Sequence, residues 1–166
     1  MNTPTFQNVA VIGAGAMGRG IAQIATQAGS TVWLFDVQAS AAAAAIAAVY
    51  EQWDKLLAKG RLSADTVAAC KARLQTADSL TALADCNLVV EAIVERLDVK
   101  RKLFADLEAI VNADTVLATN TSSLSVTAIA AGLQHPARVA GYHFFNPVPL
   151  MKVVEVIAGL KTAPAV

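Results

Sequence analysis

The sequence predicts an α/β fold in which helices cover both faces of a doubly wound, mostly parallel sheet. Short apolar runs alternate with longer helical patterns along most of the chain, as strands and helices do in such folds. A glycine-rich turn at residues 13–18 separates the first apolar run from the first helical pattern. Because 55% of the 166 residues are hydrophobic, we expect one domain, residues 1–166, with a large core.

The charge balance limits the partners of this chain. Lys and Arg together number 13, as do Asp and Glu, so no broad basic surface is expected for nucleic acid or anionic lipid. The apolar runs are shorter than the ~18 to 20 residues of a membrane-spanning helix, and the first residues show no signal peptide. We therefore expect a cytoplasmic protein with neither a nucleic-acid nor a membrane partner. Cys70 and Cys86 are too far apart for a metal site and are predicted to be reduced core thiols.

The first elements form a βαβ unit that is followed by an inserted helical hairpin. A strand over 7–12 leads through the glycine turn into a helix that ends near residue 28, and a second strand covers 31–35. Helices over 39–57 and 63–74, joined by a short turn, form the hairpin. The alternation then resumes, with strands expected at 87–90, 115–119, 138–142 and 152–157 and helices at 98–111 and 125–131.

The glycine turn has the pattern G-x-G-x-x-G, formed by Gly13, Gly15 and Gly18, with Ala16 and Met17 between the last two. After a strand and before a helix, the first glycine permits a tight turn, the second lets the backbone approach a pyrophosphate, and the third lets helix and strand pack closely. The helix N-terminus then faces the anion. In this context the pattern predicts a Rossmann-type dinucleotide site; a turn that only permits close packing is the alternative.

Asp36, directly after the second strand, indicates which dinucleotide binds. It lies eighteen residues after Gly18, where a carboxylate accepts hydrogen bonds from an adenosine ribose and repels the 2′-phosphate of NADP. We therefore predict NAD as the cofactor. Arg19 lies inside the first helical turn, away from that carboxylate, and is predicted to be solvated.

His143 follows a predicted strand and is the best candidate for a general base. Imidazole exchanges protons near neutral pH, and hydride transfer from an alcohol requires a group that takes the hydroxyl proton. Glu155, twelve residues later, meets His143 if the last two strands lie side by side, and it would then orient the imidazole. The alternative is a structural histidine at a strand end. His135 precedes a proline in a predicted surface loop.

The other polar residues near the strand ends have more than one interpretation. Ser122 or Ser123 is expected to cap the following helix, which leaves the other hydroxyl for a substrate oxygen. Asn120 and Asn146 are expected to form turns through their side-chain amides. Glu91 and Glu95 are expected to be a solvated acidic pair.

Four segments resemble the 3-hydroxyacyl-CoA dehydrogenase family, in the same order and at similar spacing: VAVIGAGAMGRGIAQ, VVEAIVE, TNTSSLSVTAIA and GYHFFNPVPLMKVVEV. Together they span nearly the whole chain. The resemblance implies NAD-dependent oxidation of a 3-hydroxyacyl-CoA, such as 3-hydroxybutyryl-CoA, to a 3-oxoacyl-CoA by hydride transfer. It further implies that His143 is the base, Glu155 its partner and Ser122 the hydroxyl that holds the substrate oxygen.

The resemblance also implies binding roles. Asp36 would bind the adenosine ribose, and four residues would line the rest of the NAD site or its junction with substrate: Glu95, Lys100, Asn120 and Asn146, the last of which would also contact substrate. On the helical hairpin, Lys55, Lys59 and Arg61 would offer positive charge to CoA; a solvated helix face is the alternative.

In this family a helical C-terminal domain completes the acyl pocket and forms the dimer, and this sequence ends before such a domain. We therefore expect residues 1–166 alone to turn over poorly and the intact enzyme to be a homodimer. Two alternatives remain. One is another hydroxy-acid dehydrogenase, which is not expected to carry the HFFNP segment. The other is a non-catalytic NAD-binding or sensing module, in which His143 and Glu155 would be idle.

Overall fold

The computed structural model describes residues 4–166, which form a seven-stranded sheet in the order β3-β2-β1-β4-β5-β6-β7. All neighbouring strands are parallel except β7, which pairs antiparallel with β6. The predicted mostly parallel sheet is therefore confirmed. The chain runs outward from β1 to β3 and returns to β4 on the other side of β1, so a crevice opens at the carboxyl ends of β1 and β4. The strands are β1 (Asn8–Ile12), β2 (Thr31–Phe35), β3 (Leu74–Thr76), β4 (Leu88–Glu91), β5 (Val116–Thr119), β6 (Val139–Phe144) and β7 (Val154–Ala158).

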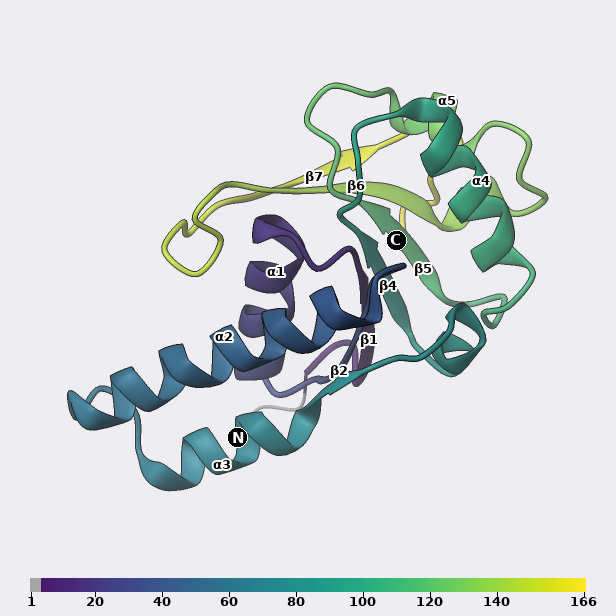
Figure 1. The fold of residues 1–166 in the computed structure, drawn as a ribbon. Helices are drawn as coiled ribbons and strands as arrows, with labels where there is room; N and C mark the ends of the chain where they lie inside the picture. The colour runs from purple at the N-terminus through teal and green to yellow at the C-terminus, as the bar shows by residue number, and fades with distance from the viewer. Residues whose placement is uncertain (1–3) are drawn as a thin grey trace.

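Helices cover both faces of this sheet, as predicted (Figure 1). On one face α1 and α2 pack against β1 and β2, and on the other α4 and α5 pack against β4 and β5. The helices are α1 (Ala16–Gln27), α2 (Ala39–Ala58), α3 (Ala64–Arg73), α4 (Leu97–Glu108) and α5 (Val126–Ala130), with short 3-10 turns at Leu80–Leu83 and Pro136–Arg138. No helix within residues 4–166 is long and apolar enough to span a bilayer.

The central strand β1 contributes to two separate parts of the core. Val9 and Val11 pack among the residues of α1 and α2, and Ala10 and Ile12 pack on the opposite face, because successive side chains of a strand point in opposite directions. Both cysteines are buried and unbridged, which confirms the predicted core thiols. Burial raises the pKa of the Cys86 thiol to about 11, so this thiol stays protonated.

The predicted hairpin is formed by α2 and α3, and it extends away from the sheet (Figure 1). Gly60 reverses the chain with a φ of 66°, a backbone conformation that glycine adopts most readily. Ser63 then caps α3. The hydroxyl of Tyr50 on α2 lies 2.9 Å and 3.0 Å from the carbonyl oxygens of Lys71 and Leu74, which fastens the two helices together.

Three strands differ from the prediction, and one of them is β7, which begins at Val154, two residues later than predicted. The sequence does not predict β3, because its three residues carry no strand pattern and take their conformation from pairing with β2. β6 ends at Phe144, two residues later than predicted, because the antiparallel partner β7 pairs with it up to that point. The prediction that His143 follows the strand is therefore wrong, since His143 lies within β6 opposite Glu155.

Candidate active site

Two cavities lie along the carboxyl edge of the parallel strands. The larger, of about 560 Å³, is lined by the glycine turn, the end of β2 and part of α4. The smaller, of about 350 Å³, brings together six residues that the sequence predicts as site residues: Met17, Glu95, Asn120, Ser122, His143 and Asn146. Ala92 and Ile93 line both cavities. The two spaces therefore adjoin across the short segment that follows β4.

The glycine turn lies where the sequence predicts a turn that binds a pyrophosphate. Gly13 has a φ of 101°, and a Cβ on Gly18 would lie 1.8 Å from the Gly13 oxygen, so both positions require glycine. At Gly15, by contrast, a Cβ would meet nothing within 4 Å. Gly15 is the N-cap of α1, no side chain caps the helix, and its first turn has no acidic residue. The first amides of α1, those of Ala16 and Met17, are thus left for an anion.

Asp36 is fixed beside this turn by two backbone amides. Its Oδ2 accepts a hydrogen bond from Ala14 at 2.8 Å and its Oδ1 accepts one from Gln38 at 2.9 Å. A carboxylate has about four acceptor positions, so lone pairs remain on the side of the larger cavity that Asp36 lines. These features fit the ribose of a dinucleotide, and a negative charge here disfavours a 2′-phosphate.

His143 and Glu155 form a hydrogen-bonded pair across β6 and β7. They are partners in the antiparallel register, and His143 Nδ1 lies 2.9 Å from Glu155 Oε2. The bond engages Nδ1, so Nε2 is the ring nitrogen left for a molecule in the smaller cavity. The Phe145 ring packs against the imidazole with a centroid separation of 4.6 Å. The geometry is that of an oriented imidazole at the edge of a cavity.

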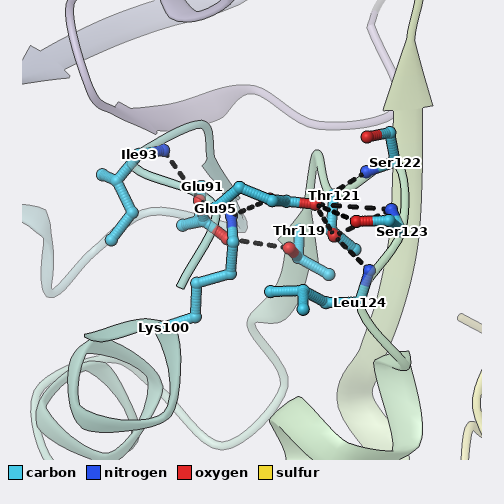
Figure 2. Close-up of polar contacts among 9 residues, drawn as sticks. All are labelled: Glu91, Ile93, Glu95, Lys100, Thr119, Thr121, Ser122, Ser123 and Leu124. Atoms are coloured by element: carbon cyan, nitrogen blue, oxygen red, sulfur yellow. Dashed lines mark hydrogen bonds and ion pairs between the residues drawn. The ribbon is translucent and has the colours of Figure 1, made fainter. Parts of the chain in front are cut away.

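The turn after β5 is organised by the carboxylate of Glu95, as Figure 2 shows. Glu95 Oε1 accepts hydrogen bonds from the Thr121 hydroxyl, from the Ser122 amide at 3.2 Å, and from the Ser123 amide and hydroxyl, both at 3.3 Å. In Figure 2 the Ser122 hydroxyl points away from this network. The expectation that Ser122 or Ser123 caps α5 is wrong, because Ser125 does so by accepting from the Ala128 amide.

These contacts set the protonation of Glu95. Burial acts to raise the pKa of this carboxyl, but the hydrogen bond from Thr121 and the positive charge of Lys100 outweigh it, so the pKa lies below its ordinary value. Glu95 is therefore ionised near neutral pH. Its Oε2 lies 3.2 Å from Lys100 Nζ.

Glu91 and Lys100 lie beneath this turn and are almost fully buried, with side-chain exposures of 0% and 1%. Lys100 Nζ lies 2.5 Å from Glu91 Oε1. The expectation of a solvated pair, Glu91 with Glu95, is therefore wrong for Glu91. Lys100, expected to line the cofactor site, lines neither cavity and contacts carboxylates instead.

The two asparagines differ from each other. The Asn120 side chain accepts a hydrogen bond from the Phe144 amide at 2.8 Å, so it ties β5 to the end of β6 rather than to nearby backbone. Asn146 is exposed at the rim of the smaller cavity.

Arg19 is exposed, as predicted. The hairpin cations are also exposed, and none of them lines either cavity: Lys55, Lys59 and Arg61.

Comparison with known proteins identifies the family. Residues 8–166 match the family described as 3-hydroxyacyl-CoA dehydrogenase, NAD binding domain. This chain belongs to that family. It is 48% identical over 160 residues to the 3-hydroxyadipyl-CoA dehydrogenase of Escherichia coli (strain K12), a match that covers 96% of this chain and 34% of that protein. It is 41% identical to the 3-hydroxybutyryl-CoA dehydrogenase of Bradyrhizobium diazoefficiens, covering 96% of this chain and 55% of that protein.

Solved structures of this family have the same fold. A crystal structure of 3-hydroxybutyryl-CoA dehydrogenase from Escherichia coli K12 matches with a TM-score of 0.95 at 47% identity, over 98% of this chain and 34% of that chain. The (S)-3-hydroxybutyryl-CoA dehydrogenase from Ralstonia eutropha matches with a TM-score of 0.92 at 37% identity, over 97% of this chain and 57% of that chain. The chain thus spans between a third and three-fifths of these relatives. The family match confirms NAD as the cofactor.

Three polar residues were not predicted from the sequence to take part in the network: Glu91, Thr119 and Thr121. A signal for the buried pair was present in α4, where Lys100, Phe104 and Leu107 follow the spacing of one helix face and are all buried. A lysine that is itself buried on such a face needs a buried anion as its partner. The last residue of β4, Glu91, provides it.

Proposed function

We propose that the protein oxidises 3-hydroxyacyl-CoA thioesters to 3-oxoacyl-CoA with NAD, and that His143 is the general base. The observation that carries this proposal is the pair of adjoining cavities. One is lined by the glycine turn and Asp36. The other is lined by the His143 imidazole, whose Nδ1 lies 2.9 Å from Oε2 of Glu155, the residue that orients the ring. Relatives named as 3-hydroxyadipyl-CoA and 3-hydroxybutyryl-CoA dehydrogenases support the substrate class.

The reaction needs a proton acceptor, a hydride acceptor and a group that holds the substrate oxygen. NAD, when bound, supplies the hydride acceptor. His143 Nε2 takes the proton from the 3-hydroxyl as the C3 hydrogen leaves with its electron pair, and the C–O bond becomes a carbonyl. Glu155 holds Nδ1 protonated and stabilises the imidazolium that forms. The Ser122 hydroxyl donates a hydrogen bond to the same oxygen.

The helical hairpin is the proposed contact for CoA. Lys55 on α2 is 73% exposed, and its nearest carboxylate is that of Glu51 at 3.7 Å. Lys59 and Arg61 at the hairpin tip are also exposed. Cations with so few contacts of their own are available to the phosphates of a CoA ester. Replacing all three with alanine is expected to raise the KM for the thioester severalfold and leave the NAD dissociation constant unchanged.

The exposed apolar surface of β7 and the residues next to it supports a second proposal, that a further part of the protein packs here. Every residue of β7 is exposed, and seven large hydrophobic residues between positions 150 and 160 are exposed as well: Leu150, Met151, Val153, Val154, Val156, Ile157 and Leu160. Apolar surface of this extent is typical of an interface. We propose that the remainder of the longer protein packs here and completes the acyl pocket, as the greater length of the relatives suggests. A polypeptide of residues 1–166 would then bind NAD but turn over far more slowly than the longer protein.

The test of the proposed function is NADH formation by the full-length protein. A panel of 3-hydroxyacyl-CoA esters of different chain length, including one with a terminal carboxylate, is assayed with NAD and with NADP. We expect NADH formation with at least one ester and a strong preference for NAD. A protein that binds NAD but forms no NADH with any ester would favour the sensing module. In the Glu155→Gln variant, kcat is expected to fall less than in a variant that lacks His143.

A further inference from the structure

The network in Figure 2 contains a buried charge pair that the proposed reaction does not use directly. Glu91 is the last residue of β4, and Lys100 is the fourth residue of α4. Both side chains are almost fully buried. Replacing a buried ion pair with well-packed apolar residues often leaves stability unchanged or raises it. Stability alone is therefore a weak reason for two charges at this position.

The side-chain hydrogen bonds of Glu91 reach three segments near the smaller cavity. Its Oε1 accepts from Lys100 and, at 2.7 Å, from the amide of Ile93, which lines both cavities. Its Oε2 accepts from the Thr119 hydroxyl at 2.7 Å, at the end of β5. One carboxylate thus joins β4, the segment after it, α4 and β5.

Lys100 connects Glu91 to Glu95, whose carboxylate holds the turn that carries Ser122. Its ammonium lies between Glu91 and Glu95, at 2.5 Å from an oxygen of the first and 3.2 Å from Oε2 of the second. The other oxygen of Glu95 holds the Thr121 hydroxyl and the amides of Ser122 and Ser123. The orientation of Glu95 thus depends on where Lys100 lies.

We propose that Glu91 is a positioning residue, which through Lys100 and Glu95 fixes the turn 121–124 and so sets the place of the Ser122 hydroxyl. This inference rests on the proposed function, in which that hydroxyl holds the substrate oxygen. Glu91 touches neither cavity. It acts on the reaction only through the residues it holds. A displacement of about 1 Å in a reacting geometry can lower a rate by about 10²-fold.

A matched control exists at the opposite end of the sheet. Glu108, at the end of α4, accepts hydrogen bonds from the amides of Gln134 and His135 at 2.8 Å and 2.9 Å. Its Oε1 lies 3.7 Å from the guanidinium of Arg138, and the two side chains are 14% and 7% exposed. Glu108 is thus a largely buried carboxylate that holds a loop beside a cation, and it lines neither of the two cavities.

The experiment compares Glu91→Gln with Glu108→Gln in the full-length protein. Hydrogen exchange is measured at the amides of residues 122–124 and 134–135, together with Tm, kcat, KM for the thioester and the NAD dissociation constant. We expect Glu91→Gln to accelerate exchange at 122–124 and to lower kcat by roughly 10- to 10²-fold, with the NAD dissociation constant changed less than about threefold. Glu108→Gln should accelerate exchange at 134–135 and leave kcat within about twofold.

A second variant separates positioning from folding. The double change Glu91→Gln with Lys100→Met removes both charges, so no unpaired buried charge remains to destabilise the protein. We expect its Tm to lie above that of Glu91→Gln, while exchange at 122–124 stays fast and kcat stays low. A double variant that recovers wild-type kcat and slow exchange would contradict the positioning role. One that does not fold would contradict it too, because the pair would then serve the fold.

Failure of this inference is distinguishable from failure of the proposed function. If the wild-type protein forms NADH but Glu91→Gln and Glu108→Gln change exchange and kcat alike, Glu91 has no positioning role. If the wild-type protein forms no NADH from any ester, the proposed function is wrong, and the exchange pattern alone then decides whether Glu91 fixes the turn. Equal exchange at 122–124 in wild type and Glu91→Gln overturns the inference in either case.

Discussion

The two ends of the sheet carry the same kinds of polar side chain but leave different groups available. The protein has two histidines: His143 lies near the end of β6, and His135 lies shortly before β6 begins. Each end also has a carboxylate that accepts backbone amides beside a cation, namely Glu95 with Lys100 and Glu108 with Arg138.

The two ends of the sheet differ in which polar groups remain available to a ligand. At the amino end, the Arg138 guanidinium donates to the carbonyl oxygen of Asn112 at 2.6 Å, and Glu108 accepts two amides. Arg138 Nε has no hydrogen-bond partner, but it is buried, and neither Arg138 nor Glu108 lines one of the two cavities. At the carboxyl end, the free nitrogen of His143 and the Ser122 hydroxyl adjoin a cavity. The residue types alone therefore do not mark the site. Polar groups left unpaired beside a cavity do.

The largest expected effect comes from the two histidines. In the full-length protein, His143→Ala should lower kcat by roughly 10²-fold or more, because general-base catalysis typically contributes ~10² to 10⁴-fold, and NAD affinity should change little. The matched variant His135→Ala should keep kcat within about twofold. Steady-state kinetics and calorimetry with NAD check both. Similar kcat values for the two variants would remove the proposed difference between the ends of the sheet.

A smaller effect is expected at Asp36. In Asp36→Asn the side chain keeps an acceptor oxygen for the Ala14 amide but loses the negative charge. Charge-assisted hydrogen bonds contribute about 1.5–3 kcal/mol, so NAD affinity should fall roughly ten- to a hundredfold and the preference over NADP should relax. Calorimetry with both cofactors measures this. An unchanged preference would show that another residue excludes the 2′-phosphate.

The glycine turn provides a comparison within the carboxyl end. A Cβ at Gly15 meets no protein atom within 4 Å, whereas a Cβ at Gly18 would lie 1.8 Å from a backbone oxygen. Gly15→Ala should therefore keep Tm and weaken NAD binding by about tenfold, or ~1.4 kcal/mol, because the methyl group occupies the space in front of the helix. Gly18→Ala should lower Tm itself, since overpacking destabilises by about 1–3 kcal/mol. Thermal melts with and without NAD separate the two effects.

The smallest expected effect on activity comes from the amino end, where Glu108 should instead contribute to the pH dependence of stability. Burial acts to raise its pKa, but the amides of Gln134 and His135 outweigh it, so the pKa in the folded protein is lowered. The unfolded chain then binds more protons in the acid range. The stabilisation is present above the ordinary glutamate pKa and is lost as pH falls through the folded value.

Glu108→Gln should therefore lower Tm at neutral pH, and the difference from wild type should shrink on acidification. Melting curves across the acid range, at fixed salt, provide the measurement. A Tm difference that stays constant with pH would mean that Glu108 acts only through packing.

Much of the fold was predictable because its signals are local. The glycine turn, the strand before it, the helix after it and the hairpin follow from residue spacing within short segments, and the structure confirms them. Residues at the ends of parallel strands meet at one edge of a sheet, so the gathering of Ser122, His143 and Asn146 around one cavity was also predictable. Their catalytic and binding roles stay predictions.

The sequence by itself thus determined most of the elements, their alternation and the edge at which the polar residues meet, because periods of 2 and 3.6 residues are properties of the local chain. Only the tertiary structure decided that β3 forms, that Glu91 is buried against Lys100, and that Asn120 ties β5 to β6. Each of these depends on a partner from another segment. A carboxylate is solvated or buried according to which cation and which amides the fold brings to it, and the residues next to it in the sequence do not specify them.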